Sequence, residues 1–273
     1  MSVVGEPTLL VGLGGLVAIY VRGWRRSSGG RARAVRFALA VIVLLVALGP
    51  AIESRADRSL PFHMLQHQLL TLVVAPLLAT SGLAGNLWHA IAPRDRPVSR
   101  RWDRRLGLPG DRAVTMDPRI AVVAVLAAAA LHLGVILLWH LPALYGAALA
   151  NPGLHHLEHL TMLGTAVLFW MAVVTAAADD LAVPGAVAGL AMVAVGGTGL
   201  GLVMLGAPLP LYGWYGESAS ALDQQRLAGA LMKVTSLLTY AGAAAVIAVG
   251  WLQRLHGAET PRIEVGAAGR RPS

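Results

Sequence analysis

Cysteine is absent from the 273 residues, and lysine occurs once, as Lys233. The lack of cysteine excludes disulfides and thiolate metal sites, so soft-metal chemistry in this chain must use histidine and methionine. Charged residues make up only 13% of the chain and hydrophobic residues 56%, whereas a soluble domain carries roughly 25% charged residues. Most of the chain therefore faces something other than water, and we expect an integral membrane protein.

The formal net charge of +8 comes almost entirely from arginine. The arginines stand in short segments between apolar runs, which is typical of topology signals and of contacts with anionic lipid head groups. This placement predicts anionic lipids as partners and argues against nucleic acid.

Seven apolar runs have lengths near the roughly 17–25 residues that a membrane-spanning helix needs, and strand-like alternation is absent. Because backbone polar groups in lipid must be hydrogen-bonded within the protein, these runs predict helices. We therefore expect an all-α polytopic membrane protein, a bundle of about seven transmembrane helices. The runs cover residues 7–21, 35–51, 62–80, 119–140, 156–178, 185–206 and 226–251, and the first is the weakest.

Arginines gather after the first run, after the third run and in the C-terminal tail. With seven spans these three segments fall on one side, which the positive-inside rule assigns to the cytoplasm. The N-terminus is then outside and the C-terminus cytoplasmic. We expect a single transmembrane domain over residues 1–256, a cytoplasmic loop at about 93–118, and a disordered polar tail at 257–273.

Most of the nine histidines stand at predicted outer helix ends. His63 and His67 are spaced i, i+4 and so share one helix face, as do His155 and His159. His140 closes the fourth run on the same side. Since polar groups within membrane segments are costly and tend to mark functional sites, the combined pattern favours metal or haem ligation by these five histidines.

Other polar and thioether side chains accompany the histidines. Glu158 neighbours His159 and is a candidate to orient an imidazole from behind. Lys233 lies well inside the last run, where it either snorkels to a helix-end carbonyl or pairs with Glu158 or an anionic ligand. Further secondary candidates on this side are Met204, Asp223 and Met232.

Gly197 and Gly201 in the sixth run have the spacing that lets another helix backbone approach closely. The approaching helix belongs either to this chain or to a second copy, so a homodimer remains open.

Four short motifs stand in order over residues 60–235. They are His63-Met-Leu-Gln-His67 followed by Pro76, Trp139-His140-Leu-Pro142, His155-x-x-Glu158-His159, and Asp223-Gln-Gln followed by Gly229 and Met232. In this order and spacing they resemble the CtaG family of bacterial cytochrome c oxidase assembly factors. Lys233 departs from that pattern, in which an apolar or aromatic residue is expected after the methionine.

The resemblance implies a multi-pass protein of the bacterial inner membrane, without enzymatic activity, that helps to make a haem–copper oxidase of the respiratory chain. Copper insertion is the implied step, and the implied partners are oxidase subunits or a periplasmic copper donor. It implies functional roles for His63, His67, His140, His155 and His159, with Met64, Asp223 and Met232 as lesser candidates.

Copper suits this set of side chains because imidazole binds both oxidation states and thioether favours Cu(I). Two alternatives stay open on the residues alone. His155-x-x-Glu158-His159 matches the inverted zinc motif of metallopeptidases, in which the glutamate is the base. Facing histidines on two helices could also ligate haem. A transporter is a weaker alternative, since no inverted repeat or pair of broken helices is evident.

Overall fold

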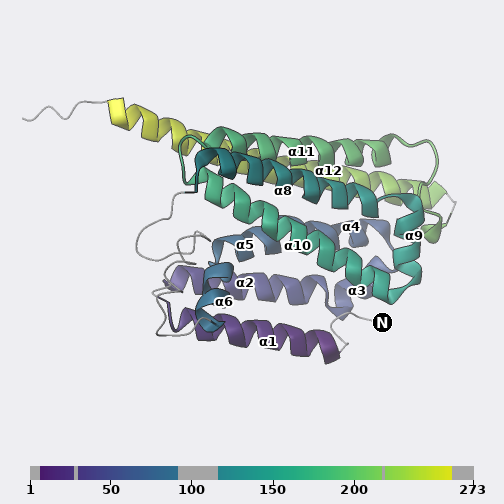
Figure 1. Cartoon of the computed structure of the whole chain (residues 1–273). Coiled ribbons are helices and arrows are strands. Elements are labelled where there is room, and N and C mark those ends of the chain that lie inside the picture. The colour runs from purple at the N-terminus through teal and green to yellow at the C-terminus, as the bar shows by residue number, and fades with distance from the viewer. Residues whose placement is uncertain (1–6, 28–29, 92–115, 217–218, 260–273) are drawn as a thin grey trace, which may run out of the picture.

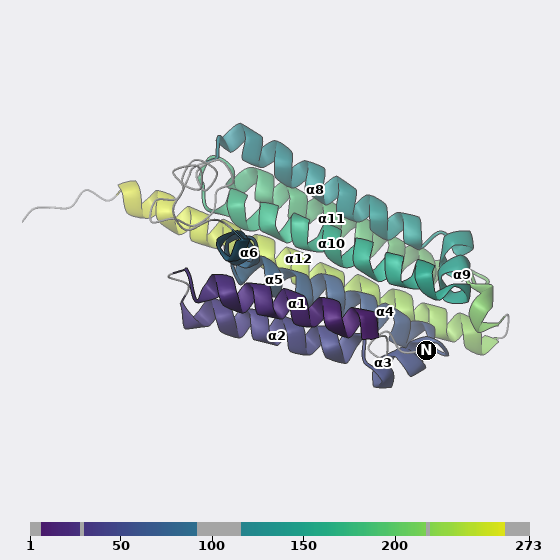
Figure 2. The same cartoon turned by 60° about the horizontal axis from the view of Figure 1, so that its bottom comes forward.

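The computed structural model describes residues 7–27, 30–91, 116–216 and 219–259, and within these ranges every regular element is a helix. The predicted all-α fold is confirmed. The long helices lie side by side along one direction and form an elongated bundle (Figures 1 and 2). α1 (Pro7–Trp24) begins at the end of the bundle that carries α3 (Pro50–Ala56) and α9 (Pro142–Ala150), and α12 (Ala219–Glu259) finishes at the opposite end (Figure 1).

Five helical runs are long and apolar enough to cross a membrane. They are α4–η2–α5 (Leu60–Gln68, Leu69–Val74, Ala75–Thr80), α8 (Pro118–Trp139), α10 (Pro152–Ala177), α11 (Val183–Gly206) and α12 (Ala219–Glu259). A sixth span results if α2 (Arg31–Ala47) and α3 (Pro50–Ala56), bent by 46° at their junction, are counted as one. The predicted number of seven is reached only when α1 (Pro7–Trp24), which contains a shorter apolar stretch, is counted as well.

Two short helices lie between the predicted spans. α6 (Leu83–Ile91) packs against α1, and α9 (Pro142–Ala150) lies across the end of the bundle beside the start of α10 (Figure 1). The predicted cytoplasmic loop at 93–118 falls almost wholly within residues 92–115, outside the described part of the chain. The predicted tail at 257–273 is described only to Glu259, and α12 includes these first residues.

The last two long helices approach each other closely at a pair of glycines. A Cβ on Gly201 would lie 2.7 Å from the carbonyl oxygen of Gly229, and a Cβ on Gly229 would lie 2.6 Å from that of Gly201. Gly197, one turn earlier on α11, faces the Ser236 hydroxyl. The small-residue spacing predicted from sequence therefore serves packing of α11 against α12 within the chain, as close backbone approach requires.

Aromatic and small apolar side chains fill the interior between α8, α10, α11 and α12. Phe169, Trp170 and Tyr240 are buried there and contact one another, with Ala129, Ala166 and Ala186 beside them in the same cluster. Other large apolar side chains of these helices, such as Val123, Leu160 and Leu202, are exposed on the outside of the bundle, where lipid is their expected solvent. This interior packing holds α10 against η2 and α5, which continue the α4 run, and so positions the site.

Candidate metal centre

Two helices carry most of the predicted histidines to one buried position. α4 provides His63 and His67, and α10 provides His155, Glu158 and His159, with every one of these side chains buried. All five lie within the first turns of the two helical runs, Leu60–Thr80 and Pro152–Ala177, which begin at the end of the bundle where α3 and α9 are found (Figure 1). The i, i+4 pairs predicted from sequence thus face each other across one helix–helix contact.

Local sequence explains where these helices begin. α4 starts after the extended residue Ser59, and Pro61 occupies its first turn, where a missing N–H costs nothing. α10 starts at Asn151, whose side-chain oxygen accepts hydrogen bonds from the N–H groups of Gly153 (2.9 Å) and Leu154 (3.2 Å). These helix starts fix the first turns, and hence the direction in which the histidines one turn later point.

A π-helical segment follows directly after the α4 histidines. η2 spans Leu69–Val74, and its Thr71 hydroxyl donates to the carbonyl of His67 at 2.8 Å. The Thr71 carbonyl in turn accepts from the Trp170 indole at 3.1 Å, which ties η2 to α10. Wider turns of this kind are frequent at functional sites, because they re-aim the side chains before them.

Glu158 lies between the two α4 histidines. Its Oε1 is 3.6 Å from His67 Nε2 and its Oε2 is 4.0 Å from His63 Nε2. One potential ligand atom from each of His63, His67 and Glu158 lies within 4.8 Å of the others, and the three could hold a metal ion. Sequence reasoning assigned Glu158 to orient His159 from behind, whereas the fold places its carboxylate among the donor atoms themselves.

His155 and His159 complete the cluster from the α10 side. The two rings lie 4.4 Å apart between centroids, and His159 is 5.3 Å from His67. His155 stacks on His63 at 5.3 Å with an angle of 18° between the rings. Four imidazoles and one carboxylate therefore share a single compact volume, and we call these residues the histidine cluster: His63, His67, His155, Glu158 and His159.

Most nitrogen and oxygen atoms of the histidine cluster have no hydrogen-bond partner within the described protein. This holds for both ring nitrogens of His63, His67 and His159, for His155 Nε2 and for both Glu158 oxygens. Leaving one buried polar group unpaired costs about 1–3 kcal/mol. A cation bound among these atoms would pair several of them at once, so the donors present fit a metal ion such as copper or zinc.

His140, which closes the fourth predicted apolar run, lies at the edge of the histidine cluster. Its ring is 6.2 Å from that of His67. Its Nδ1 donates to the Ile136 carbonyl at 2.7 Å, which leaves Nε2 to face the Met64 sulfur at 3.4 Å. His140 and Met64 thus form a nitrogen–thioether pair beside the cluster. Met64 packs in one apolar layer with the other predicted thioethers, Met204 and Met232.

The fold leaves two of the predicted polar candidates out of the histidine cluster. Asp223 is exposed and pairs with Arg226 at 3.4 Å. Lys233 is half-buried where α12 meets Gly201, and none of the salt bridges among the described residues joins Lys233 to Glu158. In the Asp223-Gln-Gln motif the buried residue is Gln225, which accepts from the Leu211 N–H and donates to the Met204 carbonyl.

Sequence reasoning missed the residues that close the cluster from the end of the bundle. Glu53 of α3 is buried, with Oε1 3.6 Å from His155 Nδ1 and Oε2 accepting from Gln66 Nε2 at 2.7 Å. Glu53 stands in a charged stretch between two apolar runs, which looks like a solvent-exposed turn. Gln66 lies within a quoted motif, but nothing in its spacing predicts that its amide meets a carboxylate.

Tyrosine side chains connect the short helices that cover the histidine cluster at the end of the bundle. The Tyr145 ring of α9 lies 5.2 Å from His63, and its hydroxyl meets that of Tyr215 in η3 (Gly213–Tyr215) at 3.1 Å. Tyr215 also donates to the carbonyl of Ala56 on α3, at 3.1 Å. Burial raises the pKa of Tyr145 well above its ordinary value, so this phenol stays neutral and can keep its hydrogen bond.

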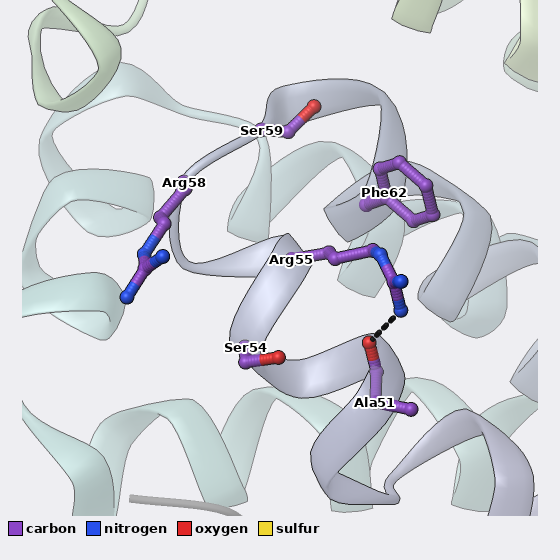
Figure 3. A pocket seen from close by; sticks show the side chains of 6 residues that line it. All are labelled: Ala51, Ser54, Arg55, Arg58, Ser59 and Phe62. Carbon is purple, nitrogen blue, oxygen red and sulfur yellow. Dashed lines mark hydrogen bonds between the residues drawn. The ribbon is translucent and has the colours of Figure 1, made fainter.

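The outer side of α3 presents a different surface. A surface pocket there is lined by Ala51, Ser54, Arg55, Arg58, Ser59 and Phe62 (Figure 3). Arg55 donates to the Ala51 carbonyl at 2.7 Å and lies over the Phe62 ring, while Arg58 points away from both (Figure 3). None of these six side chains belongs to the histidine cluster.

Comparison with known proteins identifies the family but gives no individual relative. No curated protein matches the chain, and no solved structure matches it either. The family model described as cytochrome c oxidase caa3 assembly factor (Caa3_CtaG) matches residues 17–254, which include every helix of the histidine cluster. With a match over that much of its length, the chain belongs to the cytochrome c oxidase caa3 assembly factor family.

Proposed function

We propose that this protein binds a copper ion in the histidine cluster as cargo and passes it to a subunit of a cytochrome c oxidase during assembly. Membership of the assembly-factor family supports the oxidase as client. The observation that carries the copper proposal is the set of buried donor atoms on His63, His67, His159 and Glu158 that lack partners in the described protein.

The kind of donor also supports cargo rather than a permanent structural ion. Imidazole and carboxylate bind copper less tightly than thiolate does, and the chain has no cysteine. The His140–Met64 pair beside the cluster offers a nitrogen and a thioether, and thioether prefers Cu(I). Copper could therefore change ligands stepwise within this end of the bundle.

Two other readings of the histidines fit the geometry less well. A metallopeptidase of the inverted zinc motif needs Glu158 free as a base beside ligands His155 and His159, whereas Glu158 faces His63 and His67. Haem needs a slot for the macrocycle between facing ligands, but the rings of the cluster contact one another at centroid distances of 4.4 to 6.3 Å. A single small ion suits this spacing better.

We further propose that the protein spans the bacterial inner membrane seven times, with its N-terminus outside. This topology counts α1 and the bent pair α2–α3 as spans and follows the positive-inside rule. It would place the cluster near the outer face, where a periplasmic donor could deliver copper and an oxidase subunit could receive it. A protease-accessible tag at either terminus, probed in sealed vesicles, tests the orientation.

The decisive experiment is metal analysis with a visible spectrum on the purified full-length protein. After loading with Cu(I) or Cu(II), we expect bound copper, no Soret band, and tighter binding of copper than of zinc. A Soret band in the purified protein would point to haem. Zinc-dependent cleavage of a membrane peptide that is lost in Glu158→Gln would point to a peptidase.

A cellular test links binding to assembly. Changing His63, His67, His155 and His159 together to alanine should remove bound copper and lower oxidase activity in cells. His256→Ala, which alters an exposed histidine near the end of α12, is the matched control and should change neither. Full copper binding with normal oxidase activity in the fourfold variant would overturn the proposal.

A further inference from the structure

Glu53 is buried in a helix whose neighbouring charges are exposed. Its side chain is 3% exposed, although Arg55 on the same short helix and Asp57 directly after it are exposed. Arg55 is directed toward Ala51 and Phe62 on the outer side of α3 (Figure 3). Among the described residues the ion-pair contact of Glu53 is to the ring of His155, and no salt bridge joins Glu53 to an arginine.

The Glu53 carboxylate is held from behind by an amide. Gln66 Nε2 donates one hydrogen to Glu53 Oε2 at 2.7 Å and another to the Ala47 carbonyl at 2.9 Å. A primary amide nitrogen has two hydrogens, so both are used. The orientation of Gln66 is therefore fixed, and it presents a donor to Glu53.

The two nitrogens of His155 have different surroundings. Nδ1 is 3.6 Å from Glu53 Oε1, whereas Nε2 is buried and has no hydrogen-bond partner in the described protein. A carboxylate only accepts hydrogen bonds, so it favours the tautomer with the proton on Nδ1. That tautomer leaves the Nε2 lone pair unprotonated, as a metal ligand requires.

We propose that Glu53 is a positioning residue for the histidine cluster. It holds His155 in the tautomer and orientation that offer Nε2 to a bound ion. This inference rests on the proposed copper function. It divides the two buried carboxylates by role: Glu158 lies among the ligands, and Glu53 acts only through His155.

The substitution Glu53→Gln makes a specific prediction about the ring. Because Gln66 presents a donor, the new amide must turn its oxygen toward Gln66 and its NH₂ toward His155. An NH₂ group donates to Nδ1 and so favours the proton on Nε2, which is the reverse tautomer. A near-isosteric change should therefore invert the tautomer of a residue on another helix.

Nitrogen-15 NMR of histidine-labelled, metal-free protein in detergent reads the tautomer directly, with His155→Asn to assign the resonance. We expect the Nδ1–H form in the unaltered protein and the Nε2–H form in Glu53→Gln. Copper affinity, measured by competition with a chelator, should fall by about 10–100-fold in Glu53→Gln. Asp57→Asn, which changes the exposed carboxylate at the end of α3, is the matched control and should change neither result.

A double-mutant cycle separates positioning from a general loss of packing. In a His155→Ala background, Glu53→Gln should lower copper affinity no further. An equal loss in both backgrounds, or an unchanged His155 tautomer in Glu53→Gln, overturns the inference. If Glu53→Gln does not fold, Glu53→Asp is the second variant. Its shorter side chain keeps the carboxylate charge but moves it away from His155. We expect a smaller change of the His155 tautomer toward Nε2–H and a smaller fall in copper affinity.

The two proposals fail in different ways. Absence of copper binding in the unaltered protein would refute the proposed function, and with it the role of Glu53 toward a metal. Copper binding with full affinity in Glu53→Gln would refute only the positioning role.

Discussion

His67 and His132 are both fully buried histidines on helical runs long and apolar enough to cross a membrane, yet their surroundings differ completely. His132, in the middle of α8, has a partner for each nitrogen: Thr165 Oγ1 lies 3.1 Å from Nδ1, and the Tyr240 hydroxyl lies 3.4 Å from Nε2. His67, near the start of the α4 run, has neither nitrogen hydrogen-bonded within the described residues.

The comparison indicates that burial does not by itself mark a ligand. A buried imidazole with both nitrogens paired contributes to the stability of the bundle, as most buried polar groups do. An unpaired one costs stability unless something outside the chain satisfies it. The histidine cluster gathers several unpaired donors in one place, which is how a site for an exchangeable ion differs from a structural hydrogen-bond network.

The largest effect is expected for His67→Ala. His67 contacts His63, His159 and Glu158, so its loss removes a donor that faces three other members of the cluster. Copper affinity, measured by chelator competition in detergent, should fall by more than the roughly 10–100-fold typical for residues that only support a ligand. Unchanged affinity would mean that copper binds elsewhere.

Glu158→Gln should weaken copper binding and also stabilise the metal-free protein. Both carboxylate oxygens are buried without hydrogen bonds in the described structure, and an unpaired buried charge is costly. The neutral amide removes that cost but is a poorer ligand, so we expect at least about a 10-fold lower affinity with a higher melting temperature of the metal-free form.

Thermal unfolding of metal-free and copper-loaded samples measures both effects of Glu158→Gln. The gap between the two melting temperatures should shrink relative to the unaltered protein, since the stabilisation by a bound ligand increases with the logarithm of its affinity. A lower melting temperature of the metal-free variant would indicate that Glu158 stabilises the empty cluster, for example by pairing with a protonated His67.

His132→Ala should lower stability and leave copper affinity unchanged, which is the opposite of the pattern expected for Glu158→Gln. It deprives the Tyr240 hydroxyl of its partner and leaves a cavity beside Phe169, so we expect a loss of about 1–3 kcal/mol in stability. Copper affinity should not change, because His132 contacts none of the cluster. A large drop in affinity without loss of stability would contradict the distinction between paired and unpaired histidines.

The helices and the i, i+4 pairs could be predicted because they depend on local spacing. His63 with His67, and His155 with His159, share a face on any helix. The role of Glu158 could not be predicted, since it depends on how α4 and α10 pack. The burial of Glu53 could not be predicted either, because a seven-residue helix in a charged stretch has no apolar pattern that would indicate burial.

Asp223 and Gln225 belong to one motif, but the sequence does not indicate that one is exposed and the other buried. The Asp223 side chain is 74% exposed, and its ion pair among the described residues is with Arg226. Such surface pairs contribute at most about 1 kcal/mol. Gln225 is buried and links α12 to Met204 of α11 and to Leu211 in the segment after α11.

The smallest effect is therefore expected for Asp223→Asn, below about 0.5 kcal/mol in stability and with copper affinity unchanged. Gln225→Ala, its matched comparison, should cost about 1–3 kcal/mol because it leaves a buried N–H and carbonyl without partners. Thermal unfolding and chelator competition on the two variants measure both quantities. A fall of 10-fold or more in the copper affinity of Asp223→Asn would place this carboxylate in the path of the ion, and the histidine cluster would then extend to the start of α12.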